Sequence, residues 1–141
     1  METQVMPKVL YTAKTHTTGG REHGISRSDD GHLNITLSTP GTGGSGTNPE
    51  QLFAAGWSAC FEGAMQIEAR RRRIELPADT AIDAEVNLRY GSDGFSLSAR
   101  LNISLPGIDG ETARALVDAG EKTCPYSKAI KGNVDVEINL V

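Results

Sequence analysis

Two cysteines are the residues of this 141-residue chain best suited to covalent chemistry. Cys60 lies in an apolar stretch at residues 48–61, and Cys124 stands directly before a proline. A cysteine is a nucleophile only as its thiolate, and burial among apolar side chains raises the pKa of a thiol. Two interpretations therefore stay open at this point: a redox pair that the fold brings together, or two inert buried thiols.

Activation of Cys60 would need a neighbouring positive charge, and arginine supplies one at any working pH. An arginine inside a core needs a carboxylate beside it. Arg21, in a glycine-flanked turn, and Glu50, at the start of the stretch that contains Cys60, are the candidates. Ten helical residues span about 15 Å, so Glu50 would hold a long arginine rather than touch the thiol. The alternative is that Glu50 only stabilises the start of the helix and that Arg21 is an ordinary surface residue.

The stretch around Cys60 is predicted to be a long helix over about residues 49–73. Asn48 is a good N-cap, and Pro49 suits the first helical position. The helix is apolar on nearly every side, which is typical of a helix buried in a core. Gly56 and Gly63 indicate a closely packed neighbour. We therefore expect other elements to cover this helix.

Alternating apolar and polar residues predict strands elsewhere in the chain. The expected strands lie at residues 9–13, 25–28, 33–38, 82–90, 95–105 and 134–140. A second helix is expected over 110–123 and a helical turn over 126–130. This order predicts one α+β domain over residues 1–141, with antiparallel sheets packed on the long central helix and the second helix. The central helix needs more cover than one sheet face gives, so a homodimer is expected.

Composition excludes several classes of protein. A net charge of −4 and a pI near 5.3 argue against a nucleic-acid partner. The sequence has no apolar run near the roughly 20 residues that span a membrane, and no basic-plus-apolar leader. We therefore expect a cytoplasmic protein, where two cysteines are unlikely to serve as a permanent structural disulfide.

Three motifs resemble the organic hydroperoxide resistance proteins, the Ohr branch of the Ohr/OsmC family. They are T-G-G-R at 18–21, N-P-E-Q-L-F-A-A-G-x-x-A-C-F at 48–61 and C-P-Y-S-x-A at 124–129. The resemblance covers nearly the whole chain and implies a thiol-dependent peroxidase on an intertwined α+β homodimer. Two departures are visible: Glu22 and His23 precede the glycine where a single acid is common, and Trp57 replaces a common tyrosine.

The resemblance also implies the roles of individual residues. Cys60 matches the peroxidatic cysteine, Cys124 the resolving cysteine, Arg21 the activating arginine and Glu50 the acid that orients it. The implied reaction forms a Cys60 sulfenic acid, then a Cys60–Cys124 disulfide. No bound cofactor is implied, and the expected reductant is dihydrolipoamide on a lipoylated protein, or another dithiol.

Apolar side chains near Cys60 suit an organic hydroperoxide better than hydrogen peroxide. The candidates for substrate contact are Leu52, Phe53, Trp57, Phe61 and Met65. Most of these side chains are equally suited to a core. Tyr126 and Ser127, which follow Cys124, are candidates either for adjusting its approach to Cys60 or for a plain helix-terminus role.

Other functions remain to be weighed against this one. Within the family, a member of the osmotically inducible branch would have a broader peroxide preference. Outside it, the chain would be a redox-sensing dimer without turnover. A metal site is not expected, because His16, His23 and His32 have irregular spacing. A Cys–His hydrolase lacks a visible Asn or Asp to orient the base.

Overall fold

The computed structural model describes residues 5–141, which fall into two compact units. The first unit extends to Pro49, and the second runs from Glu50 to Val141. The expectation of a single domain stays a prediction.

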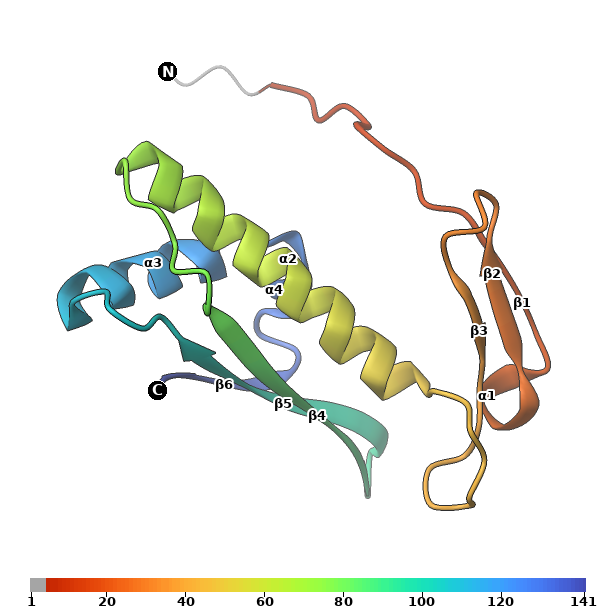
Figure 1. Cartoon of the computed structure of the whole chain (residues 1–141). Coiled ribbons are helices and arrows are strands. Elements are labelled where there is room, and N and C mark those ends of the chain that lie inside the picture. The colour runs from red at the N-terminus through yellow and green to blue at the C-terminus, as the bar shows by residue number, and fades with distance from the viewer. Residues whose placement is uncertain (1–4) are drawn as a thin grey trace. The chain divides into compact units, whose positions relative to one another are not determined.

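The first unit contains a small antiparallel sheet (Figure 1). Its elements are β1 (Thr15–Thr18), α1 (Gly20–His23), β2 (Ile25–Ser28) and β3 (Asn34–Thr36). The strands pair in the order β1-β2-β3. The strand predicted over residues 9–13 is wrong, since residues 5–14 form no regular element and Val9 and Tyr11 are exposed. An alternating pattern forms a strand only where a neighbouring strand supplies hydrogen bonds, and in this unit the β1–β2 ladder begins at Thr15.

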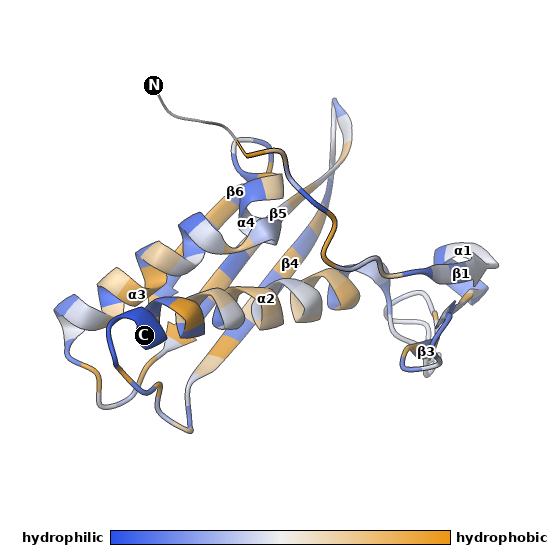
Figure 2. Ribbon diagram, turned by 90° about the horizontal axis from the view of Figure 1, so that it is seen from above, coloured by the Kyte–Doolittle hydropathy of each residue, from blue (hydrophilic) through white to orange (hydrophobic). Residues whose placement is uncertain are grey.

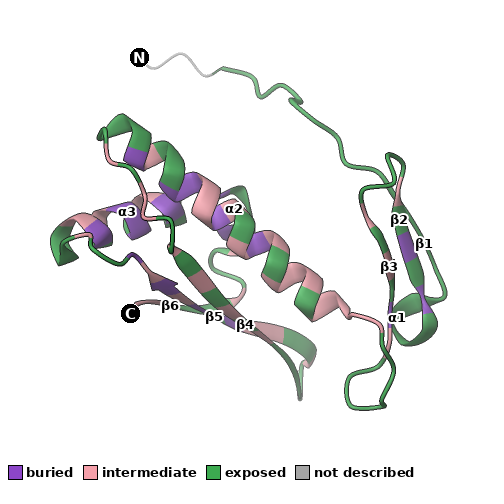
Figure 3. Cartoon of the chain, viewed as in Figure 1, coloured by how far each residue is buried: buried purple, intermediate pink, exposed green. Residues whose placement is uncertain are grey.

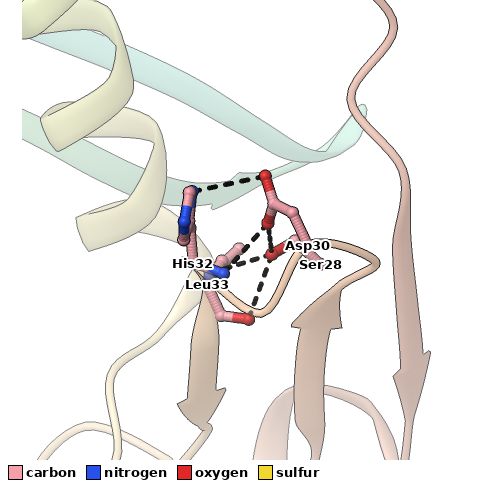
Figure 4. Close-up of polar contacts among 4 residues, drawn as sticks. All are labelled: Ser28, Asp30, His32 and Leu33. Carbon is pink, nitrogen blue, oxygen red and sulfur yellow. Dashed lines mark hydrogen bonds and ion pairs between the residues drawn. The ribbon is translucent and has the colours of Figure 1, made fainter.

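Side-chain hydrogen bonds close the turn between β2 and β3 (Figure 4). The Ser28 hydroxyl donates to Asp30 Oδ1 over 2.6 Å and accepts from the backbone N–H of Leu33 over 2.9 Å. The backbone N–H of His32 also donates to Asp30 Oδ1. These bonds, with that from Ser28 the strongest, hold the pKa of Asp30 below its usual range. The turn therefore aligns β2 with β3, and its histidine lies beside Asp30.

The long helix α2, Pro49–Arg71, belongs to the second unit from its second residue, Glu50, onward. The helix starts at the predicted proline and ends two residues before the predicted end. Arg73 adopts a left-handed conformation, with φ of 58°. The backbone N–H groups of Arg73 and Ile74 donate back to the carbonyls of Arg70 and Ala69, which is the pairing of a Schellman motif. Four consecutive arginines thus form a regular helix terminus.

A three-stranded sheet follows, made of β4 (Ala81–Gly91), β5 (Gly94–Ser104) and β6 (Asp135–Leu140). β4 and β5 form the predicted antiparallel hairpin, from the pair Ala81 and Ser104 to the pair Gly91 and Gly94. β6 pairs with β5 in parallel, so the expectation of purely antiparallel sheets is wrong. The chain leaves β5, passes through two helices and enters β6 in the same direction, which is the connection that parallel pairing requires.

Two helices, α3 (Gly110–Thr123) and α4 (Pro125–Ile130), form this connection. α3 has the predicted bounds, and the side chain of Asp109 caps it by accepting from the backbone N–H of Thr112. The predicted helical turn near residue 126 is α4. Both helices therefore lie where the sequence placed them.

The core of the second unit forms between α2, α3 and one face of the sheet (Figures 2 and 3). β5 contributes Leu101 and Ile103, and α3 contributes Leu116 and Val117. The buried residues of α2 are Trp57, Phe61, Ala64, Met65 and Ala69. The other side of α2 is exposed in this chain and includes Ala55, Ala59 and Ile67. The sequence predicted a central helix buried in a core, and in this chain only one side of that helix is buried.

Candidate active site

The fold of the second unit brings the two cysteines together. Cys60 lies on α2 and is half-buried, whereas Cys124 is fully buried between α3 and α4. Their thiols are close enough for Cys124 to raise the pKa of Cys60, and neither is engaged in a disulfide. The sequence left open a redox pair or two unrelated thiols, and the structure shows adjacent thiols. This juxtaposition is the defining feature of the site.

The position of Cys124 follows from its local backbone. Cys124 is the C-cap of α3 and the N-cap of α4, with extended φ and ψ of −63° and 119°. Pro125 disfavours a helical conformation at the preceding residue, so α3 ends at Thr123. The backbone N–H of Cys124 donates to Gly120, and its carbonyl accepts from Lys128. The thiol is therefore held at a bend between two helices.

The environment within this unit raises the pKa of Cys60 and so favours its protonated form. Burial raises the pKa of the Cys60 thiol, and the hydrogen bond with the Cys124 thiol raises it further. The backbone N–H of Tyr126 also interacts with Cys60 and acts in the opposite direction, lowering the pKa. The net direction is upward, so a thiolate at neutral pH requires a positive charge from elsewhere.

Aromatic residues connect α2 to α4 beside the cysteines. The indole Nε1 of Trp57 donates to Ser127 Oγ over 2.9 Å, and both side chains are buried. The ring of Phe53 contacts Trp57 and Tyr126 edge-on, with centroid distances of 5.8 and 6.4 Å. Gly56 leaves room for the Tyr126 ring, since a methyl group there would lie 3.3 Å from its hydroxyl.

The link between Trp57 and Ser127 joins residues 70 positions apart. The sequence suggested Ser127 only as a neighbour of Cys124 and Trp57 only as an apolar side chain. No local pattern identifies a hydrogen bond between such distant positions. The one signal in the sequence for such a bond is the tryptophan itself, because a buried indole N–H needs an acceptor.

The five candidate substrate contacts differ in exposure. Leu52 and Phe53 are half-buried, whereas Trp57, Phe61 and Met65 are fully buried. Phe61 and Met65 pack against α3 at Gly120, where an added methyl group would lie 2.8 and 2.9 Å from them. In this chain these buried side chains fill the core, and contact with substrate stays a prediction for all five.

Arg21 lies in the first unit and Glu50 in the second. Arg21 is exposed on α1, and Glu50 is half-buried in the first turn of α2. Glycines shape the Arg21 turn: Gly19 has φ of 81°, and a methyl group at Gly24 would clash with the carbonyl oxygens of Gly20 and Thr18. The backbone therefore fixes the local form of this turn, while the roles of Arg21 and Glu50 remain predictions.

Two further features of residues 5–141 concern membranes and metal ions. No helix in this range is both long and apolar enough to cross a membrane. The same residues contain no group of three or more His, Cys, Asp and Glu side chains arranged to hold a metal ion.

Known proteins are similar to this chain in sequence and in fold. The family model for OsmC-like protein matches residues 41–139. The organic hydroperoxide resistance protein of Xanthomonas axonopodis pv. citri is 47% identical over 137 residues, covering 94% of this chain and 96% of that protein. The crystal structure of OhrB of Bacillus subtilis, an organic hydroperoxide resistance protein, has a TM-score of 0.87 and 43% identity, covering 94% of this chain and all of that one.

These matches define the class of protein: the chain belongs to the OsmC family. Within that family it belongs to the Ohr subfamily, the organic hydroperoxide resistance proteins. The resemblance found in the sequence motifs is therefore confirmed. The subfamily is known for thiol-dependent peroxidases, and the adjacent Cys60 and Cys124 thiols agree with that chemistry.

Proposed function

We propose that this protein reduces organic hydroperoxides to alcohols through Cys60 and Cys124. The observation that carries the proposal is the proximity of the two thiols, which the fold of the second unit brings together. A disulfide requires the two cysteines to approach within a few ångströms, and here the two thiols are neighbours in the reduced chain. Membership of the Ohr subfamily supports the choice of an organic hydroperoxide as the substrate.

The reaction balances with these two thiols and one external dithiol. The Cys60 thiolate attacks the distal peroxide oxygen, the O–O bond breaks, and the departing alkoxide takes a proton to become the alcohol. Cys60 is left as a sulfenic acid. Cys124 then attacks the Cys60 sulfur, forming the S–S bond as the S–O bond breaks, and its proton leaves with the hydroxide as water. An external dithiol reduces the disulfide by thiol exchange and is itself oxidised.

Arg21 supplies the missing positive charge in this proposal. Burial and Cys124 raise the pKa of Cys60, so the thiolate needs a cation beside it. A guanidinium there would also stabilise negative charge developing on the departing oxygen. Glu50, in the first turn of the same helix as Cys60, would orient the guanidinium.

The substrate is proposed to be an apolar, fatty-acid-like or alkyl hydroperoxide. Leu52 and Phe53 are half-buried on the helix that carries Cys60, so they present apolar surface near the thiol. Trp57, Phe61 and Met65 would support this surface from the core. Apolar surface beside the thiol favours the alkyl part of an organic hydroperoxide, which hydrogen peroxide does not have.

A homodimer of intertwined chains is proposed as the working form. Val5, Met6, Val9 and Leu10 are each more than 80% exposed, and one side of α2 is uncovered. Among the described residues, β4 and β6 each have one edge without a partner strand. Exposed apolar residues and open edges are surfaces that a second copy would cover.

The proposed location is the cytoplasm, with a lipoylated protein as reductant and its dihydrolipoamide as the entering dithiol. A disulfide that forms in every cycle needs a compartment that supplies reducing equivalents.

Peroxide consumption under dihydrolipoamide tests the proposed function. We expect many turnovers with tert-butyl hydroperoxide, far fewer with hydrogen peroxide, and none in Cys60→Ser. Equal rates with the two peroxides would favour the broader specificity of the osmotically inducible branch. A single oxidation of Cys60 without turnover would contradict the peroxidase and favour a redox-sensing dimer.

A further inference from the structure

The clearest unassigned feature beside the cysteines is a second connection between the two helices that carry them. Trp57 lies one turn before Cys60 on α2, and Ser127 lies one turn after Cys124 on α4. The Trp57 Nε1–Ser127 Oγ bond therefore runs alongside the Cys60–Cys124 contact. It is a side-chain hydrogen bond formed between two buried residues.

We propose that Trp57 and Ser127 are positioning residues for the resolving step, in which Cys124 attacks the Cys60 sulfenic acid. This inference rests on the proposed function. The hydrogen bond fixes the distance between α2 and α4 at the level of the two thiols. Neither residue touches the reacting atoms in this role.

Burial makes this bond a strong positional constraint. Trp57 is fully buried and Ser127 is 7% exposed, so water has little access to replace a lost partner. Moving α4 away from α2 would leave the indole N–H unsatisfied, and a buried unpaired donor is strongly unfavourable. The Phe53 ring, which contacts both Trp57 and Tyr126, adds a second contact that resists the same movement.

The shortness of α4 explains why its contact with α2 matters for the chemistry. α4 is only six residues long and follows directly from Cys124. A short helix has few internal hydrogen bonds to hold it in place, so its contacts with neighbouring elements, including the bond to Trp57 of α2, determine where it lies. Displacement of α4 would move Cys124 and the Tyr126 backbone N–H away from Cys60 together.

The consequence concerns the competition between two fates of the sulfenic acid. In the first, Cys124 forms the disulfide and water is released. In the second, the Cys60 sulfenate attacks a second organic hydroperoxide molecule, gains its distal oxygen and becomes a sulfinic acid, while the alcohol leaves. Slower attack by Cys124 favours the second fate. The ratio of sulfinic acid to disulfide therefore reports on the position of Cys124.

The test uses the full chain treated with a fixed excess of tert-butyl hydroperoxide and analysed by mass spectrometry. In Ser127→Ala we expect the ratio of sulfinic acid to disulfide to rise about three- to tenfold, the factor expected from one net hydrogen bond. Trp57→Phe, which removes the donor from the other side, should raise the ratio in the same direction. In the double variant the two effects should be less than multiplicative, because both remove one bond.

Ser58→Ala is the matched control. Ser58 lies on α2 between Trp57 and Cys60, but its hydroxyl donates to the Ala54 carbonyl of the same helix. This variant should keep the wild-type ratio. A second readout is the equilibrium between the Cys60–Cys124 disulfide and dithiothreitol, which should shift toward the dithiol in Ser127→Ala, whereas a loss of general stability alone would leave it unchanged.

The outcomes separate this inference from the proposed function. A wild-type chain that forms neither sulfenic acid nor disulfide with the peroxide overturns both. A wild-type chain that forms the disulfide overturns only the inference if Ser127→Ala and Trp57→Phe keep the wild-type ratio and the wild-type disulfide equilibrium. If Ser127→Ala does not fold, Trp57→Phe and its disulfide equilibrium decide the question.

Discussion

At the scale of single residues, the chemistry of this protein depends on the state of one thiol. Cys60 is half-buried beside a second thiol, and both features favour its protonated form. The opposing influence within the same unit is the Tyr126 backbone N–H. The reactivity of Cys60 is therefore set by a small number of neighbours, each of which can be removed separately.

Replacing Cys124 by alanine should lower the pKa of Cys60. The change removes the thiol hydrogen bond and the thiolate repulsion that raise the pKa, while burial continues to raise it. The measurement is the ultraviolet absorbance of the thiolate as a function of pH, with Cys60→Ser to identify its contribution. If the titration midpoint of Cys60 in Cys124→Ala is at or above that of the wild type, Cys124 does not raise the pKa of Cys60.

The same pKa shift predicts how the stability depends on pH. The folded chain holds the Cys60 proton more tightly than the unfolded chain, because the folded-state pKa is the higher one. This contribution to the free energy of unfolding is fully present below the unfolded pKa and is lost as the pH rises through the folded pKa. We therefore expect the free energy of unfolding, measured with urea, to fall less in alkaline solution for Cys60→Ala than for the wild type. Equal declines would contradict the prediction.

Arg21→Ala should reduce the rate of peroxide consumption by about a hundredfold or more, the loss typical of removing one group that stabilises charge in a transition state. Arg21→Lys should recover part of the rate, since it restores the charge but lacks the planar guanidinium. Arg27→Ala is the control, because Arg27 is an exposed arginine of β2 in the same unit. Similar rates for Arg21→Ala and Arg27→Ala would remove Arg21 from the mechanism.

At the scale of elements, the second unit depends on the close approach of α2 and α3. Gly120 of α3 is buried against Phe61 and Met65 of α2, at distances that leave no room for a methyl group. The approach of these helices positions Cys124, which directly follows α3 and lies four residues after Gly120. Packing at Gly120 and the geometry of the site are thus connected through one helix.

Gly120→Ala should lower the free energy of unfolding by about 1 kcal/mol. Overpacking against Phe61 and Met65 is worth about 1–3 kcal/mol, and the gain in helix propensity offsets up to about 1 kcal/mol of it. Gly110→Ala is the control, since nothing lies within contact distance of a methyl group at that end of α3. Urea denaturation measures both variants, and equal midpoints for the two would show that α2 and α3 can move apart freely.

The elements that the sequence predicted best are those with a local pattern. The hairpin of β4 and β5 alternates cleanly, and α3 has both a capping Asp109 and a stop at Cys124 before Pro125. The strand expected at residues 9–13 failed because alternation alone does not supply a partner strand. The parallel pairing of β6 was missed because direction depends on the whole path between strands.

The features of the site also differ in how far they could be predicted from the sequence. Cys60 and Cys124 could be selected from residue type alone, and their adjacency became plausible from the family motifs. The Trp57–Ser127 bond could not be predicted, because it depends on how α4 docks against α2. The approach of two helices is a property of packing, which no local pattern records.

At the scale of the whole molecule, the uncovered side of α2 calls for a partner. Ile67 is 51% exposed on that side, and Gly63 has no neighbour within contact distance of an added methyl group. A helix that is apolar on nearly every side is stable in water only when both sides are covered. The proposed second copy of the chain would provide that cover.

Ile67→Glu should therefore shift the protein from dimer to monomer and reduce its peroxidase activity. A charge placed in an apolar interface loses its hydration without gaining a partner, and this penalty opposes association. Sedimentation velocity at several protein concentrations measures the change, and Arg114→Glu, on the exposed surface of α3, is the control. If Ile67→Glu remains as dimeric as Arg114→Glu, the exposed side of α2 is not the interface. If the wild-type chain is itself a monomer with full activity, the site is complete within one chain, and the open strand edges require another explanation.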